Sequence, residues 1–163
     1  MIVDLFLFPL YTLFLTIIGV GFIFIINGGK IEGQLDNNLY FYPLAGLFAI
    51  GFVALVVNFF APVTSPVVWS FIICFLAAGM LKLPSLPLFS LFWLVGFSVM
   101  FVPLAANMGP GYDAGLYHLP HQLWLRNEKI VFGLANFHGR FGFSSILEYI
   151  QAPLWIHENL KLL

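Results

Sequence analysis

The residue types that carry acid–base and phosphate chemistry gather in one stretch, residues 107–145, which reads NMGPGYDAGLYHLPHQLWLRNEKIVFGLANFHGRFGFSS. It contains three of the four histidines and three of the six Lys and Arg residues. Carboxylates and imidazoles transfer protons near neutral pH, and Arg and Lys bind phosphate oxygens. We therefore predict that any chemistry of this protein takes place here.

Asp113 lies two residues after the segment Gly109–Gly111, whose Gly-Pro-Gly sequence predicts a loop. One interpretation makes Asp113 the N-cap of a helix that begins at Ala114, because Asp accepts hydrogen bonds from N-terminal N–H groups. The other makes its carboxylate a general base or a cation ligand that faces a cavity. The residue alone leaves both interpretations open.

His118 and His121 are three residues apart and close to Asp113 in the chain, which makes a divalent cation site one interpretation. Such a site needs a third ligand at fixed geometry. Pro120 is expected to begin a new helix in its first turn, which would turn His118 away from His121. We therefore predict two hydrogen-bonded imidazoles at an interface, with neither a metal site nor a cofactor.

Residues 121–132, HQLWLRNEKIVF, are predicted to form an amphipathic helix. The positions that share its apolar face are Leu116, Leu119, Leu123, Asn127 and Ile130. Trp124 is typical of a membrane–water interface. Arg126 and Lys129 lie on the polar side, either as solvated charges or as ligands of a lipid phosphate.

Residues 133–145, GLANFHGRFGFSS, place Asn136, His138 and Arg140 among three glycines and three phenylalanines. Glycine lets a backbone approach a ligand closely, and Arg offers a fork of donors to phosphate. Two interpretations remain: a ligand-binding turn that uses these three side chains, or a plain turn whose Arg140 reaches lipid headgroups.

The composition of the chain is that of a membrane protein. Of its 163 residues, 61% are hydrophobic and only 8% are charged, and the mean hydropathy is +1.01. Soluble domains contain about 25% charged residues. The net charge of −1 excludes a basic surface for nucleic acid. We therefore expect membrane lipid, and no nucleic acid, as a partner.

Four apolar stretches, over residues 5–26, 42–60, 67–81 and 88–104, are predicted to cross the membrane. Between residues 37 and 112, Lys82 is the only charged residue. Gly19, Gly21 and Gly46 are predicted at helix–helix contacts, because small residues let helices approach closely. The predicted fold class is therefore an all-α integral membrane protein with about four transmembrane helices, followed by a juxtamembrane loop with amphipathic helices.

Residues 1–104 are thus predicted to be a helical anchor and residues 105–145 an extracytoplasmic juxtamembrane loop. That orientation follows from Lys30 and Lys82, which the positive-inside rule places in cytoplasmic loops. Residues 146–163 are predicted to be either an amphipathic tail or the start of a truncated further span. We expect the chain to be the front part of a longer protein.

The string YDAGLYHLPHQLWLRNEKIVFGLANFHGRFGFSS resembles a segment of a family of bacterial multi-pass membrane proteins, with the form D-x-x-x-YH…W…K-V-x-x-G-L-x-N-x-HGR-x-x-F-x-S-S. That family resembles the GT-C superfamily of glycosyltransferases, which transfer a sugar from a polyprenyl-phosphate carrier. The resemblance implies that Asp113 is the catalytic base. The residues that match the rest of the segment are Tyr117, His118, Asn136, His138 and Arg140.

By this resemblance, the chain is expected to be the N-terminal part of a glycosyltransferase-like protein of the bacterial cytoplasmic (inner) membrane and cell envelope. Its substrate would be a polyprenyl-phosphate-linked sugar, with Arg126, Lys129 or Arg140 near the phosphate. The alternative is a small non-enzymatic multi-pass protein, such as an assembly factor or a subunit of a larger membrane complex.

Overall fold

The computed structural model describes residues 2–30, 39–83, 86–103, 114–137, 139–142 and 145–155, with the backbone alone at residues 2–6, 114–115, 140 and 142. Within these segments the secondary structure consists of helices and turns, without a strand. This confirms the all-helical fold class. Asp113 and His138 lie outside the described residues.

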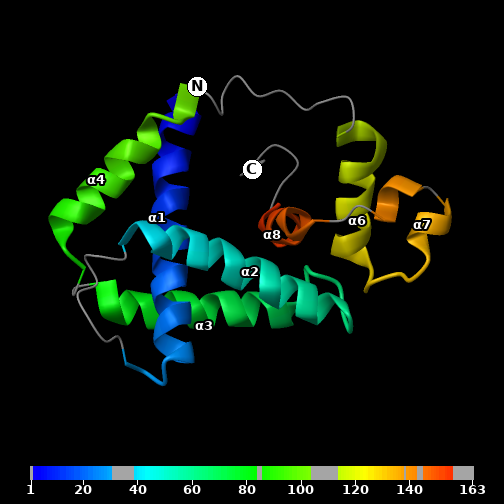
Figure 1. Cartoon of the computed structure of the whole chain (residues 1–163), viewed down its shortest axis with the longest axis horizontal. Coiled ribbons are helices and arrows are strands. Elements are labelled where there is room, and N and C mark those ends of the chain that lie inside the picture. The colour runs from blue at the N-terminus through cyan, green and yellow to red at the C-terminus, as the bar shows by residue number, and fades with distance from the viewer. Residues whose placement is uncertain are drawn as a thin grey trace. The chain divides into compact units, whose positions relative to one another are not determined.

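In chain order the elements are α1 (Ile2–Ile26), α2 (Tyr42–Asn58), α3 (Pro66–Lys82), α4 (Leu88–Val99), the π-helical turn η3 (Ala114–His118), α6 (Leu119–Asn127), α7 (Leu134–Phe137), the 3₁₀ turn η4 (Gly139–Gly142) and α8 (Ile146–Leu154) (Figure 1). The first four correspond to the four predicted apolar spans. Of the helices in the described part of the chain, two are long and apolar enough to cross a membrane, over Leu7–Ile26 and Leu39–Asn58. The helices α3 and α4 are apolar but shorter.

The helix α4 ends at Val99, before the predicted end of the fourth span at residue 104. The N–H groups of Met100 and Phe101 donate to the carbonyls of Phe97 and Ser98, three residues back. Such bonds tighten the last turn of a helix and close it. The helix α4 is therefore shorter than the predicted span, and Val102 and Pro103 after this turn are again helical.

The chain forms two compact units, one of Met1–Ala49 with Ile72–Gly109 and the other of Ile50–Phe71 with Pro110–Leu163. The helices α2 and α3 are each divided, with one part in each unit. The predicted site residues belong to the second unit.

In the first unit, α1 crosses its neighbours at glycines. A Cβ atom at Gly19 of α1 would overlap the carbonyl oxygen of Tyr42, and one at Gly46 of α2 would overlap that of Leu15. The same relation joins α1 to α3, through Gly21 against the carbonyl of Phe75 and Gly79 against that of Ile17. The predicted contacts at Gly19, Gly21 and Gly46 are therefore confirmed.

Apolar side chains complete the first unit. The ring of Phe22 on α1 meets Phe75 of α3 edge-on, with the ring centroids 5.5 Å apart. Val20, Leu39, Tyr42 and Leu86 form a buried cluster, against which Leu94 of α4 packs. Close backbone approach at glycines and dispersion between side chains both contribute to helix association in lipid, where water does not drive it.

In the second unit, α8 is the central element. Six of its nine residues are buried, and they include Glu148 and Tyr149. On one side, Gly51 of α2 lies against the side chains of Ile146 and Ile150. On another side α8 packs against α6, which continues directly from η3. Residues 146–154 of the predicted tail therefore form the core of this unit. Residues 156–163 lie outside the described part.

We expect the substitution Gly46→Ala to destabilise the first unit by about 1–3 kcal/mol, because the added methyl group forces α1 and α2 apart. The measurement is the midpoint of thermal unfolding in detergent micelles. Gly96→Ala in α4 is the matched control, since nothing lies within 4 Å of a Cβ atom at Gly96. Equal midpoints for the two variants would contradict the proposed crossing.

Candidate functional site: a buried carboxylate between two imidazoles

The turn η3 runs into α6 without a break, and Pro120 lies in the first turn of α6. A proline is tolerated there because its missing N–H has no helical acceptor. The expectation that Pro120 turns His118 away from His121 is therefore wrong. With the helical run intact, residues three apart share a face, and both imidazoles point to α8.

Both imidazoles bond to one carboxylate, that of Glu148. The Nδ1 atom of His118 lies 2.7 Å from Oε1, and the Nδ1 atom of His121 lies 2.7 Å from Oε2. The exposed fractions of the side chains are 6% for Glu148, 8% for His121 and 43% for His118. An ionised carboxylate only accepts hydrogen bonds, so each Nδ1 atom carries a proton and donates it.

Burial alone would raise the pKa of Glu148, but hydrogen bonds from His121 and His118 and the charges of these imidazoles outweigh it. The net result is a pKa of Glu148 below its ordinary value of 4.5. Beside it, burial and the negative charge of Glu148 raise the pKa of the Tyr149 hydroxyl. Glu148 is therefore the anion of this cluster at neutral pH, and Tyr149 stays protonated.

Further polar contacts continue along the α6–α8 contact. The side-chain amide of Gln122 donates to Gln151 at 2.5 Å. Arg126 donates to the backbone carbonyls of Ala152, at 3.0 Å, and Trp155, and its guanidinium lies 5.3 Å from the ring centre of Trp155. Arg126 thus satisfies carbonyls at the C-terminal end of α8, where a positive charge also suits the helix dipole.

The helix α6 turns His121, and not its leucine-rich face, towards α8. Its buried residues are His121, Gln122 and Leu125, while Leu116 of η3 and Leu123 are exposed. The predicted apolar face therefore points outwards and a largely polar face points to α8. The physical reason is that the polar groups find partners on α8, which offsets their loss of contact with water.

The end of α2 and the turn that follows it hold the C-terminal end of α6. The side-chain nitrogen of Asn58 donates to the carbonyls of Glu128, at 3.0 Å, and Leu125, at 3.4 Å. The hydroxyl of Thr64 donates to the carbonyl of Arg126 at 2.6 Å. These bonds satisfy acceptors that the end of a helix leaves without partners. Sequence reasoning missed this role of Asn58.

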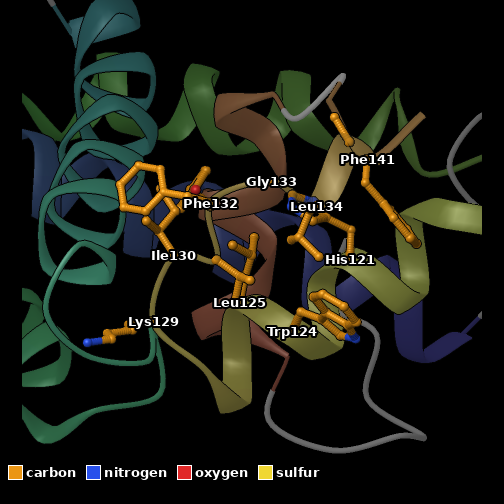
Figure 2. Close-up of a pocket in the computed structure, with 12 residues that line it drawn as sticks. His121, Trp124, Leu125, Lys129, Ile130, Phe132, Gly133, Leu134 and Phe141 are labelled. Atoms are coloured by element: carbon orange, nitrogen blue, oxygen red, sulfur yellow. The ribbon is translucent and has the colours of Figure 1, made fainter. Parts of the chain in front are cut away.

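A pocket of about 240 Å³ adjoins the cluster. Its lining is mostly apolar and aromatic, and it consists of His121, Trp124, Leu125, Lys129, Ile130, Val131, Phe132, Gly133, Leu134, Ala135, Phe141 and Tyr149. Figure 2 shows the rings of His121, Trp124 and Phe141 gathered on one side of it. The ring of Phe141 lies nearly parallel to that of Trp124, with the centroids 5.9 Å apart. Of the carboxylate's two imidazole partners, only His121 is part of this lining.

The predicted site residues fall into separate places. His118 joins the cluster, and Tyr117 packs its ring on that of His118 with the centroids 4.2 Å apart. Lys129 lies at the pocket edge, and Figure 2 shows its ammonium pointing away from the other labelled side chains. Asn136 is exposed and is not among the pocket-lining residues, and the structure describes only the backbone of Arg140.

Sequence reasoning missed Glu148, His121, Gln122 and Gln151 as members of one site. The signal was present, because polar residues recur at helical spacing in two short segments that are otherwise apolar. What the pattern did not reveal is that the two segments pair. Within the described residues, no group of three His, Cys, Asp or Glu side chains is arranged to hold a metal ion.

We expect acid to destabilise the second unit. The groups that face the Glu148 carboxylate are His118, His121 and Tyr149. Because folding lowers the pKa of Glu148, the stability that this carboxylate contributes is present above about pH 4.5 and is lost as the pH falls through the lowered value. The measurement is the thermal midpoint of the full chain in micelles between about pH 6 and about pH 3. Glu148→Gln should show a weaker dependence on acid; the same dependence in this variant would contradict the assignment.

We expect Arg126→Met to destabilise the fold by about 1–3 kcal/mol, because two carbonyls at the end of α8 lose a charged donor. Lys129→Met removes the same charge from an exposed position and should change stability by less than about 0.5 kcal/mol. Chemical denaturation of the two variants in micelles measures the difference. An equally small effect of both would show that Arg126 does not hold α8.

In a comparison with protein families, residues 1–157 match a family that is described as a domain of unknown function. No curated protein and no solved structure matches the chain.

Proposed function

The chain belongs to the DUF8201 family, and we propose that it is a multi-pass protein of the bacterial cytoplasmic membrane. In this proposal it is the N-terminal part of a glycosyltransferase-like protein, and it binds a polyprenyl-phosphate-linked sugar. The observation that carries this proposal is the orientation of α6. It buries polar residues against α8 and exposes leucine and tryptophan. This arrangement suits a helix whose outer face meets lipid.

The exposed surfaces of the apolar helices support a lipid environment. Large apolar side chains are exposed along α2 at Leu44, Phe48, Phe52 and Val56. The exposed apolar side chains of α4 are Leu88, Phe89, Phe92, Trp93, Phe97 and Val99. Soluble monomers rarely expose apolar surface of this extent. We propose that α1, α2, α3 and α4 all lie in the membrane, with α3 and α4 as short spans.

The chemistry of the pocket supports an amphiphilic ligand. Leu125, Ile130 and Leu134 offer apolar contacts to a hydrocarbon chain, whereas His121 and Tyr149 offer polar atoms. Its volume of about 240 Å³ is below the roughly 300–1,000 Å³ typical of sites that enclose a whole ligand. We propose that it holds the segment of the carrier lipid next to the phosphate, with the sugar outside.

The cationic partner of the phosphate is then Lys129 or Arg140. Lys129 is exposed at the pocket edge and its long stem can bring the ammonium to a phosphate. Arg126 is a weaker candidate, because its guanidinium already donates to two backbone carbonyls. The resemblance assigns the role of catalytic base to Asp113, and this assignment stays a prediction.

The internal pairing of the α6–α8 polar groups favours a second candidate function. His118, His121 and Gln122 all find partners on α8. Such a network also suits a non-enzymatic subunit of a membrane complex, in which it serves only to hold two helices together. Binding of a lipid phosphate at the pocket distinguishes the two candidates.

The test is the binding of radiolabelled farnesyl phosphate to the full chain in lipid nanodiscs, with empty discs subtracted. We expect saturable binding that unlabelled farnesyl phosphate displaces and that farnesol and inorganic phosphate displace weakly. Ala135→Phe fills the pocket and should raise the dissociation constant about tenfold, or about 1.4 kcal/mol.

The matched control is Ala77→Phe, the same substitution at an exposed position of α3 that does not line the pocket. It should leave the dissociation constant unchanged. Absence of saturable binding to the wild-type chain would favour the non-enzymatic candidate, and equal weakening by both substitutions would place the ligand elsewhere.

A further inference from the structure

His121 combines three properties among the described residues. It is buried, it donates through Nδ1 to Glu148 at 2.7 Å, and it lines the pocket. Its other ring nitrogen, Nε2, has no hydrogen-bond partner within the described part of the chain. An imidazole held in this way has one nitrogen committed to the protein and one available to a ligand.

We propose that His121 is the proton-accepting residue of this pocket and that Glu148 is its positioning residue. The inference rests on the proposed function, because it takes the pocket as the place where the carrier lipid next to the phosphate lies, with the sugar at the pocket edge. It assigns to His121 the role that the resemblance gives to Asp113.

The carboxylate determines which nitrogen can accept a proton. Because Glu148 is ionised and accepts from Nδ1–H, neutral His121 carries its lone pair on Nε2. A carboxylate in this position fixes the tautomer and orientation of an imidazole and stabilises the imidazolium that forms when Nε2 takes up a proton. In a lining made mostly of apolar side chains, this charge interaction is stronger than it would be in water.

The second imidazole holds the other oxygen of the carboxylate. His118 is far more exposed than His121 and does not line the pocket. Its bond to Oε1 leaves Oε2 to His121 and restricts rotation of the carboxylate. His118 is therefore a positioning residue as well, one step removed from the ligand.

In the proposed step, the hydroxyl of the sugar acceptor gives its proton to Nε2 of His121 while its oxygen bonds to the anomeric carbon of the donor sugar. The bond between that carbon and the phosphate oxygen breaks, and the polyprenyl phosphate leaves with the electron pair. The imidazolium then releases its proton to water. Throughout, the Nδ1–H bond to Glu148 remains.

The first test is the tautomer of His121 in the full chain in micelles, read from two-bond ¹H–¹⁵N correlation spectra of ¹⁵N-histidine-labelled protein. His121→Gln assigns the signals. We expect neutral His121 to be protonated at Nδ1, and we expect Glu148→Gln to lose this preference while Glu148→Asp keeps part of it. Neutral His121 protonated at Nε2 would overturn the proposal.

The second test adds farnesyl phosphate to the same samples. We expect the Nε2 signal of His121 to shift in the wild-type chain and in His118→Gln. Saturable binding that leaves this signal unchanged would overturn the role of His121. If farnesyl phosphate does not bind while His121 keeps its Nδ1–H form, the lipid-carrier proposal fails and the proton-accepting arrangement stands.

The third test uses farnesyl-phosphate-linked glucose, with water as the acceptor, and follows glucose release against pH. His121→Gln should slow release about a hundredfold or more, in the range that a general base contributes. Asp113→Asn is the comparison that separates the two assignments. Normal release by His121→Gln together with loss of release in Asp113→Asn would overturn the proposal.

Discussion

A carboxylate that loses contact with water must find donors within the protein, and Glu148 finds them in two imidazoles. Each of its oxygens accepts from one Nδ1 atom at 2.7 Å. An unpaired buried charge would cost far more than the few kcal/mol by which a protein is stable. The arrangement of η3, α6 and α8 therefore follows from this requirement, because both imidazoles must reach one side chain of α8.

That requirement also explains why α6 exposes leucine. Once His118 and His121 face α8, helical spacing sends Leu116 and Leu123 to the other side. Gln122 and Arg126 follow the histidines and reach Gln151 and the carbonyls of α8. The polar residues act together, so the removal of one leaves its partners buried and unsatisfied.

In the first unit, the helices associate through contacts of a different kind. Its helices contain almost no ionisable residues, and they meet where Gly19, Gly21, Gly46 and Gly79 allow one backbone to touch another. Close packing of small residues suits an apolar solvent, in which burial of apolar surface contributes little. The two units thus use different contacts, which are tight backbone packing in the first and paired polar side chains in the second.

The sequence alone determined the all-helical fold, the positions of the four apolar helices to within a few residues at most ends, and the glycine contacts at Gly19, Gly21 and Gly46. Composition and local periodicity are properties of neighbouring residues, so they can be read directly along the chain. The candidate site was predictable only in part. His118 was identified, but His121 was interpreted as turned away from it.

Only the tertiary structure decided that α8 pairs with α6, that Glu148 bridges the two histidines and that the polar face of α6 is the buried one. Glu148 and His118 are 30 residues apart in the chain, and nothing in either segment specifies its partner. A helix in water and a helix in lipid can have the same amphipathic pattern with opposite faces buried. Which face is buried depends on the partner and the solvent, and these are properties of the folded molecule in its environment.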